Sequence, residues 1–221
     1  KAASIAAMFL LAVSMVFVLN NEKQVQILNY TSDASSYQNP LVLSDGTEVT
    51  FNDNSNLTYP EYFKGELRNL NFHGEAFFNV TSNPDKPMII ATDNVRVKIL
   101  GTSFNLRNEK DSDIITVHLE EGKVLFYSVD ENEQILEQIK LLPGELGIYN
   151  KKNATITKEV FNNSNYKSWE TGTLDFVNAP LDEVIKTLEK TYNVSVNVNV
   201  PIDSYYLTSH YSHKSPNSIF D

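Results

Sequence analysis

The sequence predicts a mainly β protein with a small α/β module, α+β overall, in which an antiparallel β-sandwich or β-roll follows one transmembrane helix. Three observations support this prediction. The chain opens with a long apolar run, its middle alternates polar and apolar residues with a period of two, and one amphipathic helical stripe lies near its end. These patterns divide the chain into residues 1–20, 21–40, 41–161 and 166–221.

The apolar run at residues 2–19 carries no charge, and its only polar side chains are Ser4 and Ser14. About 20 apolar residues span the hydrocarbon core of a bilayer, so we expect a retained transmembrane helix at residues 1–20. A cleaved signal peptide and a buried core helix are the alternatives. The triplet at residues 12–14 resembles a cleavage site, but it lies inside the apolar run.

The flanks of this run indicate its orientation. Lys1 precedes it, which under the positive-inside rule places the residues after about 20 outside the cytoplasm. Because the sequence starts with Lys1 and not with methionine, we expect a further portion upstream. Residues 21–40 are polar and are typical of a juxtamembrane linker, with one short strand at Val25–Leu28.

Residues 41–161 show the pattern of an all-β domain. Short alternating segments are separated by Gly, Asn and Asp every 8 to 12 residues or so, which is typical of a sandwich or roll. The clearest alternating segments are 47–51, 69–72, 95–99, 115–119 and 123–127. No stretch with a period of 3.6 occurs in this region, so we expect no helix there.

Residues 166–221 predict a truncated βαβ-type module after a polar break at residues 162–165. We expect a strand over Trp169–Phe176, then a helix capped by Asn178 with Pro180 in its first turn. An apolar stripe marks the buried face of that helix and comprises Leu181, Val184, Ile185, Leu188 and Tyr192. Asn193 fits a C-cap, Val194–Val198 and Tyr205–Tyr211 are the expected further strands, and the chain stops as a second helix begins.

Composition excludes several functions. The formal net charge of −10 argues against a nucleic-acid partner, because phosphate contacts need clustered Lys and Arg. The absence of cysteine excludes disulfides, thiolate-ligated zinc and a thiol nucleophile. We find no Ser/His/Asp arrangement, phosphate-binding loop or dinucleotide fingerprint, so we expect no enzyme and no cofactor.

The histidines and turn acids do not suggest a site. His210 and His213 fall on opposite faces of a strand and turn, so we expect no metal site. We expect His73 and His118 on the outer face of the sheet. The acids that flank turn glycines are expected to be ordinary solvated residues; they are Glu75, Glu120 and Glu121.

Aromatic residues leave an alternative open. Several exceed what one small core requires and would suit a glycan platform or a protein interface; they are Tyr59, Tyr62, Phe63, Phe77, Phe78, Tyr205 and Tyr206. We expect most of them to belong to the two cores. A membrane-anchored β-sandwich that binds glycans is therefore the rival function, and it requires these rings on one concave face.

The order of short motifs carries a family resemblance over roughly residues 41–221. The motifs are Leu41–Phe51, Ser55–Pro60, Phe63–Gly65, Gly74–Val80, Val97–Asn105, Leu119–Val124 and Leu142–Glu145. Together they resemble the periplasmic domain of FecR-like transmembrane anti-sigma regulators. The pattern from Trp169 to Val194 is similar to the short α/β module attached to such regulators, which also occurs at the N-terminus of secretins and TonB-dependent transporters.

The resemblance implies partners. Such regulators cross the inner membrane once and bind an extracytoplasmic-function sigma factor through a cytoplasmic segment, which is absent from this chain. Their periplasmic part, here the residues after about 20, senses the signalling domain of an outer-membrane TonB-dependent transporter. Edge-strand pairing with hydrophobic docking would make that contact. The strand residues expected to take part are Leu174, Phe176, Val194, Val196, Tyr206 and Leu207.

The stretch Lys98–Arg107 reads KILGTSFNLR, a strand interrupted by one glycine. On its own, Gly101 predicts a bulge or a bend. The family resemblance implies a second possibility, because some relatives are thought to cut themselves by an N-to-O acyl shift. Thr102 Oγ1 would attack the Gly101 carbonyl carbon, and water would resolve the resulting ester. The bend and the self-cleavage both stay open at this point.

Overall fold

The computed structural model describes residues 14, 24–33, 35–161, 163–192, 194–199, 201–202, 204–215 and 217–220. Within these residues, no helix is long and apolar enough to cross a membrane. The predicted transmembrane helix at residues 1–20 lies outside the described residues except for Ser14, and Asn193, the expected C-cap, also lies outside them.

The larger part of the molecule, named the β domain here, is built from strands β1 to β13 and one short 3-10 helix, η1 (Ser36–Gln38). The strands are β1 (Ile27–Thr31), β2 (Leu41–Val42), β3 (Glu48–Phe51), β4 (Asn56–Pro60), β5 (Arg68–Val80), β6 (Met88–Thr92), β7 (Val95–Ile99), β8 (Thr102–Asn108), β9 (Ile114–Glu121), β10 (Val124–Val129), β11 (Ile135–Leu141), β12 (Glu145–Asn150) and β13 (Thr155–Val160). Residues 41–160 contain no helix, as predicted.

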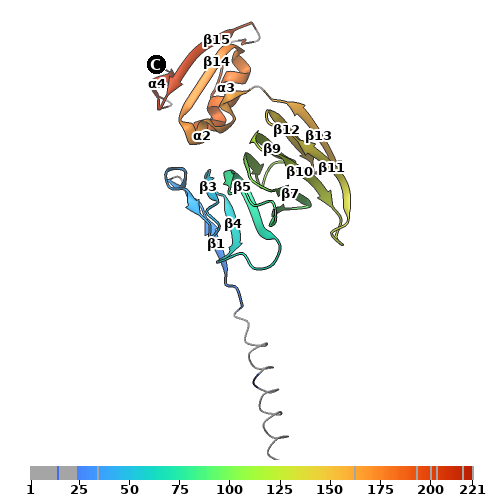
Figure 1. The fold of residues 1–221 in the computed structure, drawn as a ribbon. Coiled ribbons are helices and arrows are strands. Elements are labelled where there is room, and N and C mark those ends of the chain that lie inside the picture. Colours follow the sequence, from blue (N-terminus) through green and yellow to red (C-terminus); the bar gives the residue numbers. More distant parts are fainter. Residues whose placement is uncertain are drawn as a thin grey trace, which may run out of the picture.

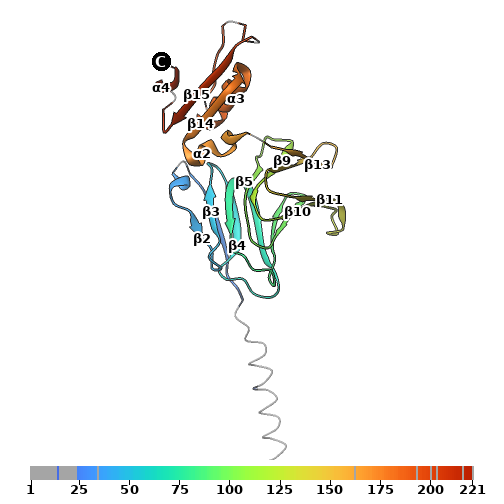
Figure 2. The same cartoon turned by 45° about the horizontal axis from the view of Figure 1, so that its top comes forward.

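Strand β5 belongs to both layers of the β domain (Figure 1, Figure 2). The main strand order is β11-β10-β7-β6-β5-β8-β9-β12-β13, with β1 and β4 beside the first half of β5 and β2 and β3 beside its second half. All pairs are antiparallel except β5 with β6, which is parallel. The predicted mainly β, sandwich-like architecture is therefore confirmed.

A glycine allows β5 to turn from one layer into the other. Gly74 has a φ of +110°, and a Cβ at this position would lie 2.5 Å from Ser55 Cα. Only glycine combines this backbone conformation with so close an approach. After the corner the strand returns toward its start, because Arg68 Nη1 donates a hydrogen bond of 2.8 Å to the carbonyl of Thr81.

Aromatic rings fill the space between the layers. Phe72 and Phe78 lie on the two halves of β5 and meet edge to face with centroids 5.3 Å apart. Phe78 stacks on Phe104 of β8 at 5.3 Å. These rings are almost fully buried, and each contributes about 2 to 3 kcal/mol of transfer free energy when removed from water.

The smaller part, named the C-terminal module, contains a 3-10 helix, three α-helices and two strands among its described residues. Its elements are η2 (Ser164–Lys167), α2 (Ser168–Thr171), β14 (Thr173–Pro180), α3 (Leu181–Tyr192), β15 (Tyr206–Ser212) and α4 (Asn217–Phe220). The predicted stripe of α3 packs inward, with Val184 and Leu188 buried. Strands β14 and β15 pair antiparallel.

Two local predictions about residues 169–178 of this module are wrong. Trp169 lies in helix α2 and not in a strand, because Asn163 caps the preceding turn and Gly172, at φ +62°, ends the helix. Asn178 is not a helix cap. Strand β14 continues to Pro180, and the Asn178 N–H donates to Thr208 Oγ1 at 2.8 Å.

The alternation at Val194–Val198 does not form the expected strand. The backbone N–H groups of Val194 and Val196 instead donate to Glu189, to its carbonyl at 3.2 Å and to its carboxylate at 2.9 Å. A polar side chain has taken the place of a neighbouring strand here.

Candidate functional site

The C-terminal module rests on the β domain at the end opposite residue 24 (Figure 1, Figure 2). Residues of β5, β8 and β9 face residues 161–167 and helix α3 around a cavity of about 170 Å³. The cavity is lined by Glu75, Asn105, Arg107, Thr116, His118, Leu146, Phe161, Tyr166 and Lys190. We name this region the junction.

A buried carboxylate at the junction is held by both parts of the molecule. Glu75 is 2% exposed and accepts hydrogen bonds from Asn52 Nδ2 and Asn105 Nδ2, each at 3.0 Å. Lys190 Nζ, on α3, lies 3.3 Å from Glu75 Oε1, and Arg107 Nε lies 4.0 Å from Oε2. An ionised carboxylate is costly to bury unless it is paired. The module therefore supplies part of what compensates Glu75, and the expectation that Glu75 is solvated is wrong.

A histidine at the junction is buried between two rings. The His118 ring centroid lies 4.6 Å from that of Phe161 and 3.8 Å from that of Tyr166. Burial lowers the pKa of His118 to about 4, against the attraction of Glu120 and with the repulsion of Lys167. The imidazole is therefore neutral at neutral pH. His118 lies on the face of β9 opposite the core residues Val117 and Leu119, as predicted, but Phe161 and Tyr166 cover it, so it is buried and not solvated.

A second ion pair crosses the junction. Lys167 Nζ lies 2.7 Å from Glu120 Oε1 and 4.3 Å from the centroid of the Phe77 ring. The Tyr166 hydroxyl donates to the same carboxylate oxygen. Burial alone would raise the pKa of Glu120, but the hydrogen bonds from Lys167 and Tyr166 outweigh it and lower that pKa. Burial and the neighbouring Glu120 raise the pKa of Tyr166, so its hydroxyl keeps its proton.

The module makes a further approach to the β domain beside η1. Tyr37 lines a cavity of about 460 Å³ together with Trp169 and Glu170 of α2. Trp169 Nε1 and Glu170 Oε2 are buried without hydrogen-bond partners among the described residues. Burial raises the pKa of Glu170.

The walls of the junction carry many polar side chains. Three buried atoms on its walls have no hydrogen-bond partner in the described part of the chain, namely Asn105 Oδ1, Arg107 Nε and His118 Nδ1. Polar groups of this kind gain hydrogen bonds with water when two surfaces separate, which lowers the cost of separation. The geometry suits a contact that can open and close.

The same geometry does not suit metal binding. No group of three or more His, Asp or Glu residues that could hold a metal ion occurs in the described ranges. His210 Nδ1 and Asp175 Oδ1 lie 2.5 Å apart across the exposed pair β14 and β15, and His73 Nε2 lies 3.7 Å from Asp93.

The predicted partner-binding residues fall into different environments. Leu174 and Phe176 are buried in the core of the module, and Leu207 packs against that core. Val194 and Val196 follow α3 and are half-buried. Tyr206 is 60% exposed on β15. Of the six, Tyr206 is the most exposed side chain.

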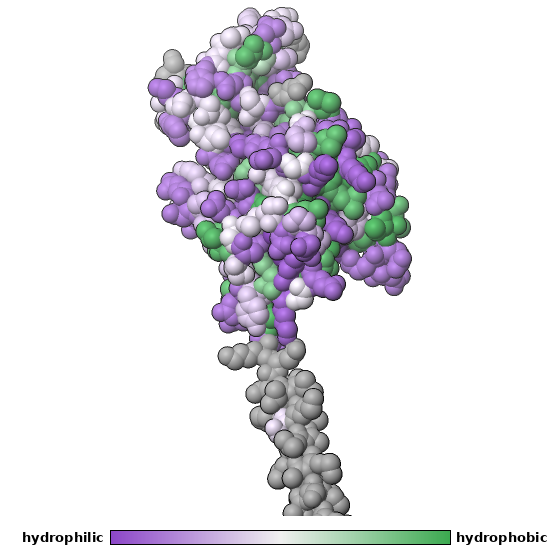
Figure 3. All heavy atoms as spheres, in the orientation of Figure 1, coloured by the Kyte–Doolittle hydropathy of each residue, from purple (hydrophilic) through white to green (hydrophobic). Residues whose placement is uncertain are grey.

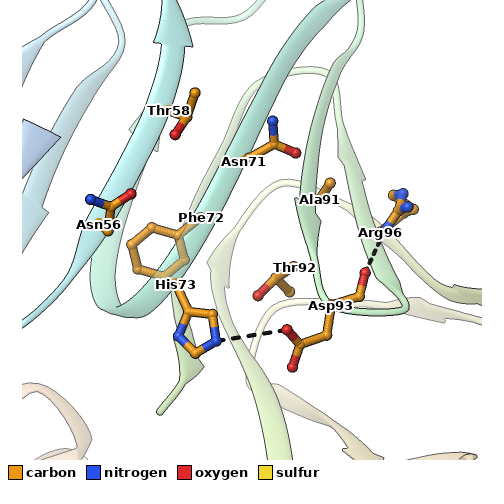
Figure 4. Close-up of a pocket in the computed structure, with 9 residues that line it drawn as sticks. All are labelled: Asn56, Thr58, Asn71, Phe72, His73, Ala91, Thr92, Asp93 and Arg96. Carbon is orange, nitrogen blue, oxygen red and sulfur yellow. Dashed lines mark hydrogen bonds and ion pairs between the residues drawn. The ribbon is translucent and has the colours of Figure 1, made fainter. Parts of the chain in front are cut away.

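The aromatic residues do not gather on one concave face. Phe78 is in the core, Phe77 lies beneath Lys167, and Tyr205 and Tyr206 are exposed on the module. A separate group of aromatic residues lines a groove at the opposite end of the β domain. The polar pocket in Figure 4, of about 260 Å³, has Phe72 on its wall, but this ring is 4% exposed and offers little area for stacking.

Gly101 connects β7 to β8, where the chain passes between layers. A Cβ at Gly101 would lie 2.5 Å from Ser82 Cα, so a close backbone approach requires the glycine. Thr102 is buried, and its hydroxyl donates to the carbonyl of Lys123 at 3.3 Å. No histidine or carboxylate among the described residues is hydrogen-bonded to Thr102 Oγ1. The close approach to Ser82 explains why a glycine is needed at position 101. Self-cleavage stays a prediction.

Sequence reasoning missed the residues that the module contributes to the junction. Tyr166 and Lys167 follow the predicted polar break, and Lys190 lies on the polar face of α3. Lys190 and Glu75 are 115 residues apart, so no local pattern connects them. The one available signal was the pair of aromatic residues, Phe161 and Tyr166, that flank an otherwise polar segment.

Comparison with known proteins gives a consistent result. A model of the FecR protein family matches residues 30–125. Two crystal structures of a candidate anti-sigma factor from Parabacteroides distasonis ATCC 8503 are similar to this chain. The first is 29% identical with a TM-score of 0.66, and the match covers 88% of each chain. The second is 30% identical with a TM-score of 0.65, and the match covers 87% of this chain and 88% of the other.

None of the curated proteins compared with the chain matches it. The two solved structures extend the similarity beyond the β domain, since each match covers most of both chains. The mainly β architecture, the family match and these structures agree. The chain belongs to the FecR family of anti-sigma regulators.

Proposed function

We propose that this chain is the periplasmic sensor part of a transmembrane anti-sigma regulator. In this proposal residues 1–20 cross the inner membrane once. The residues after about 20 receive a signal from the signalling domain of an outer-membrane TonB-dependent transporter. A cytoplasmic segment outside this chain passes the signal to an extracytoplasmic-function sigma factor. The observation that carries the proposal is the position of the C-terminal module, which lies at the far end of the β domain with an open strand edge (Figure 1).

Strand β15 supports the proposed contact with the transporter. Within the described residues it pairs with β14 alone, so its other edge has no strand partner. An open edge can accept a strand from another protein through backbone hydrogen bonds. Tyr205 and Tyr206, each 60% exposed, stand at the start of this edge and offer apolar area with a polar tip.

The junction supports the proposed relay. The module contacts the β domain through two ion pairs, Lys190 with Glu75 and Lys167 with Glu120. A transporter domain that binds the module more tightly in one arrangement of the junction shifts the population toward that arrangement. The module then acts as the receiver, and the β domain transmits its position toward the membrane.

Binding between the full chain and a purified transporter signalling domain tests the proposal. We expect Tyr206→Ala to weaken binding about tenfold, because it removes an exposed aromatic side chain that the proposal places at the interface. Tyr62→Ala is the matched control, since Tyr62 is also exposed but lies in the loop after β4, at the end of the β domain opposite the module. Both variants should unfold at the same temperature as the parent chain. Unchanged binding after substitution of both Tyr205 and Tyr206 would exclude this edge.

A further inference from the structure

An apolar groove lies at the end of the β domain opposite the module. It holds about 400 Å³ and is lined mainly by residues of β1, β4 and the loop after β4. The register places these segments together, since Ile27 pairs with Pro60 and the Glu61 N–H donates to the carbonyl of Gln26 at 2.8 Å. The apolar and aromatic lining residues are Val25, Ile27, Tyr59, Pro60, Tyr62, Phe63 and Leu67.

Several of these side chains are exposed although they are apolar or aromatic. Ile27 is 58% exposed, Tyr62 is 42% exposed and Leu67 is 37% exposed. Exposed groups of this kind that gather around one groove mark an interaction site more often than scattered single residues do. In Figure 3 this end of the β domain is where the described chain begins.

The position of the groove along the chain identifies its occupant. Val25 lines the groove, and only residues 20–24 separate it from the 18-residue uncharged run at residues 2–19. Five extended residues reach at most about 17 Å. The headgroup layer of one leaflet, which these residues must first cross, takes up roughly 6 Å of that distance. A chain anchored by residues 2–19 therefore holds this groove at most about 11 Å beyond the outer edge of the headgroup layer.

We propose that the groove formed by Ile27, Tyr62, Phe63 and Leu67 rests on the outer surface of the membrane, with its aromatic and aliphatic side chains in the headgroup layer. This inference rests on the proposed membrane anchor. Tyrosine is enriched at this depth because its ring is apolar and its hydroxyl is polar. Lys64 lines the groove, and Glu61 and Glu66 are exposed beside it. These three charges sum to −1 and do not favour anionic lipid, so apolar insertion holds the contact.

Single cysteines test this orientation, because the chain has none of its own. The full chain carrying Tyr62→Cys is labelled with bimane and reconstituted in phosphatidylcholine nanodiscs that contain a headgroup-nitroxide lipid. Tyr37→Cys is the matched control, since Tyr37 is 41% exposed, close to the 42% of Tyr62, but lies beside the module. We expect the nitroxide to quench the label at position 62 at least threefold more than the label at position 37. Added phosphatidylglycerol should not increase that quenching.

The possible results separate the membrane anchor from the membrane contact of the groove. Flotation of the unlabelled chain with lipid tests the anchor separately, and failure to float would overturn both the anchor and this membrane contact. Flotation with equal, weak quenching at both positions would overturn the contact alone. Equal quenching together with a shift in the emission of the position-62 label by a β-1,4-linked N-acetylglucosamine tetrasaccharide would assign the groove to glycans instead.

Discussion

Lys190 of helix α3 places its ammonium nitrogen 3.3 Å from Glu75 Oε1, although the two residues belong to different parts of the molecule and are 115 residues apart. Glu75 is nearly inaccessible, whereas Lys190 is partly exposed. The module thus reaches a carboxylate that is buried at the junction. Any rearrangement that moves α3 changes the environment of Glu75.

Loss of this ion pair should loosen the module. We expect Lys190→Ala to weaken docking of the module by about 1 kcal/mol, because Glu75 keeps its two asparagine donors. Hydrogen exchange at residues 161–167 should rise accordingly, while exchange in the core of the β domain stays the same. Lys186→Ala is the control, since Lys186 lies on the same helix and pairs with Asp182 within the module. A similar rise in both variants would contradict a specific role for Lys190.

Stability should fall as the pH drops toward 4. The pKa of His118 is lowered from 6.5 to about 4 in the folded state, so the unfolded chain binds the extra proton first. Stability from this residue is fully present above pH 6.5 or so and is lost as the pH falls toward about 4. The loss amounts to at most about 3 kcal/mol. Urea unfolding at several pH values measures it, and His118→Phe should flatten the dependence in this window. An unchanged slope in that variant would refute the assignment.

Two substitutions of Tyr166 separate its hydroxyl from its ring. Tyr166→Phe removes the donor to Glu120 but keeps the ring over His118, so we expect a loss of about 1 kcal/mol. Tyr166→Ala also removes the ring, and we expect a loss of about 3 kcal/mol. Nuclear magnetic resonance of the His118 ring gives a second measurement, because its pKa should rise toward the usual value in the alanine variant and much less in the phenylalanine variant. Equal effects of both substitutions would mean that stacking on His118 contributes nothing.

An alanine at Gly101 should destabilise the β domain. Its Cβ would lie 2.5 Å from Ser82 Cα, and because backbone must move to relieve that contact we expect a loss of about 2 kcal/mol. Gly65→Ala is the comparison, since no atom lies within 4 Å of the added Cβ and only its positive φ of 77° opposes the change. Thermal unfolding of both variants gives the ranking. A smaller loss at Gly101 than at Gly65 would show that the loop containing Ser82 moves freely.

Self-cleavage at the Gly101–Thr102 bond is a separate prediction. If it occurs, mass spectrometry of the purified chain should find a new N-terminus at Thr102, and Thr102→Ala should abolish it. Thr102→Ser is the informative companion, because serine keeps the hydroxyl that attacks. A persistently intact chain of 25.0 kDa under conditions that support signalling would exclude cleavage.

Sequence periodicity correctly predicted single strands and helices that pack one face on a core. The alternation at residues 95–99 became β7, and the stripe on α3 became its buried face, since each pattern reflects one side of an element packing on a core. The alternation at Val194–Val198 failed because a strand also needs a neighbour, and Glu189 satisfies those backbone groups instead. The junction could not be predicted from the sequence for a related reason. Its partners come from strands and helices whose order in space no periodicity encodes.

The bend of β5 also has a mechanical meaning. The strand forms an arch with Gly74 at its crown, and Glu75, directly beside that crown, takes the contact from Lys190. The feet of the arch are tied, because the Arg68 guanidinium donates to the Thr81 carbonyl and pairs with Asp45 at 2.6 Å. A pull on the crown therefore loads both layers of the β domain at once and cannot spread the feet. We expect the β domain to pass such a pull from the module to its opposite end as one body, without bending at Gly74.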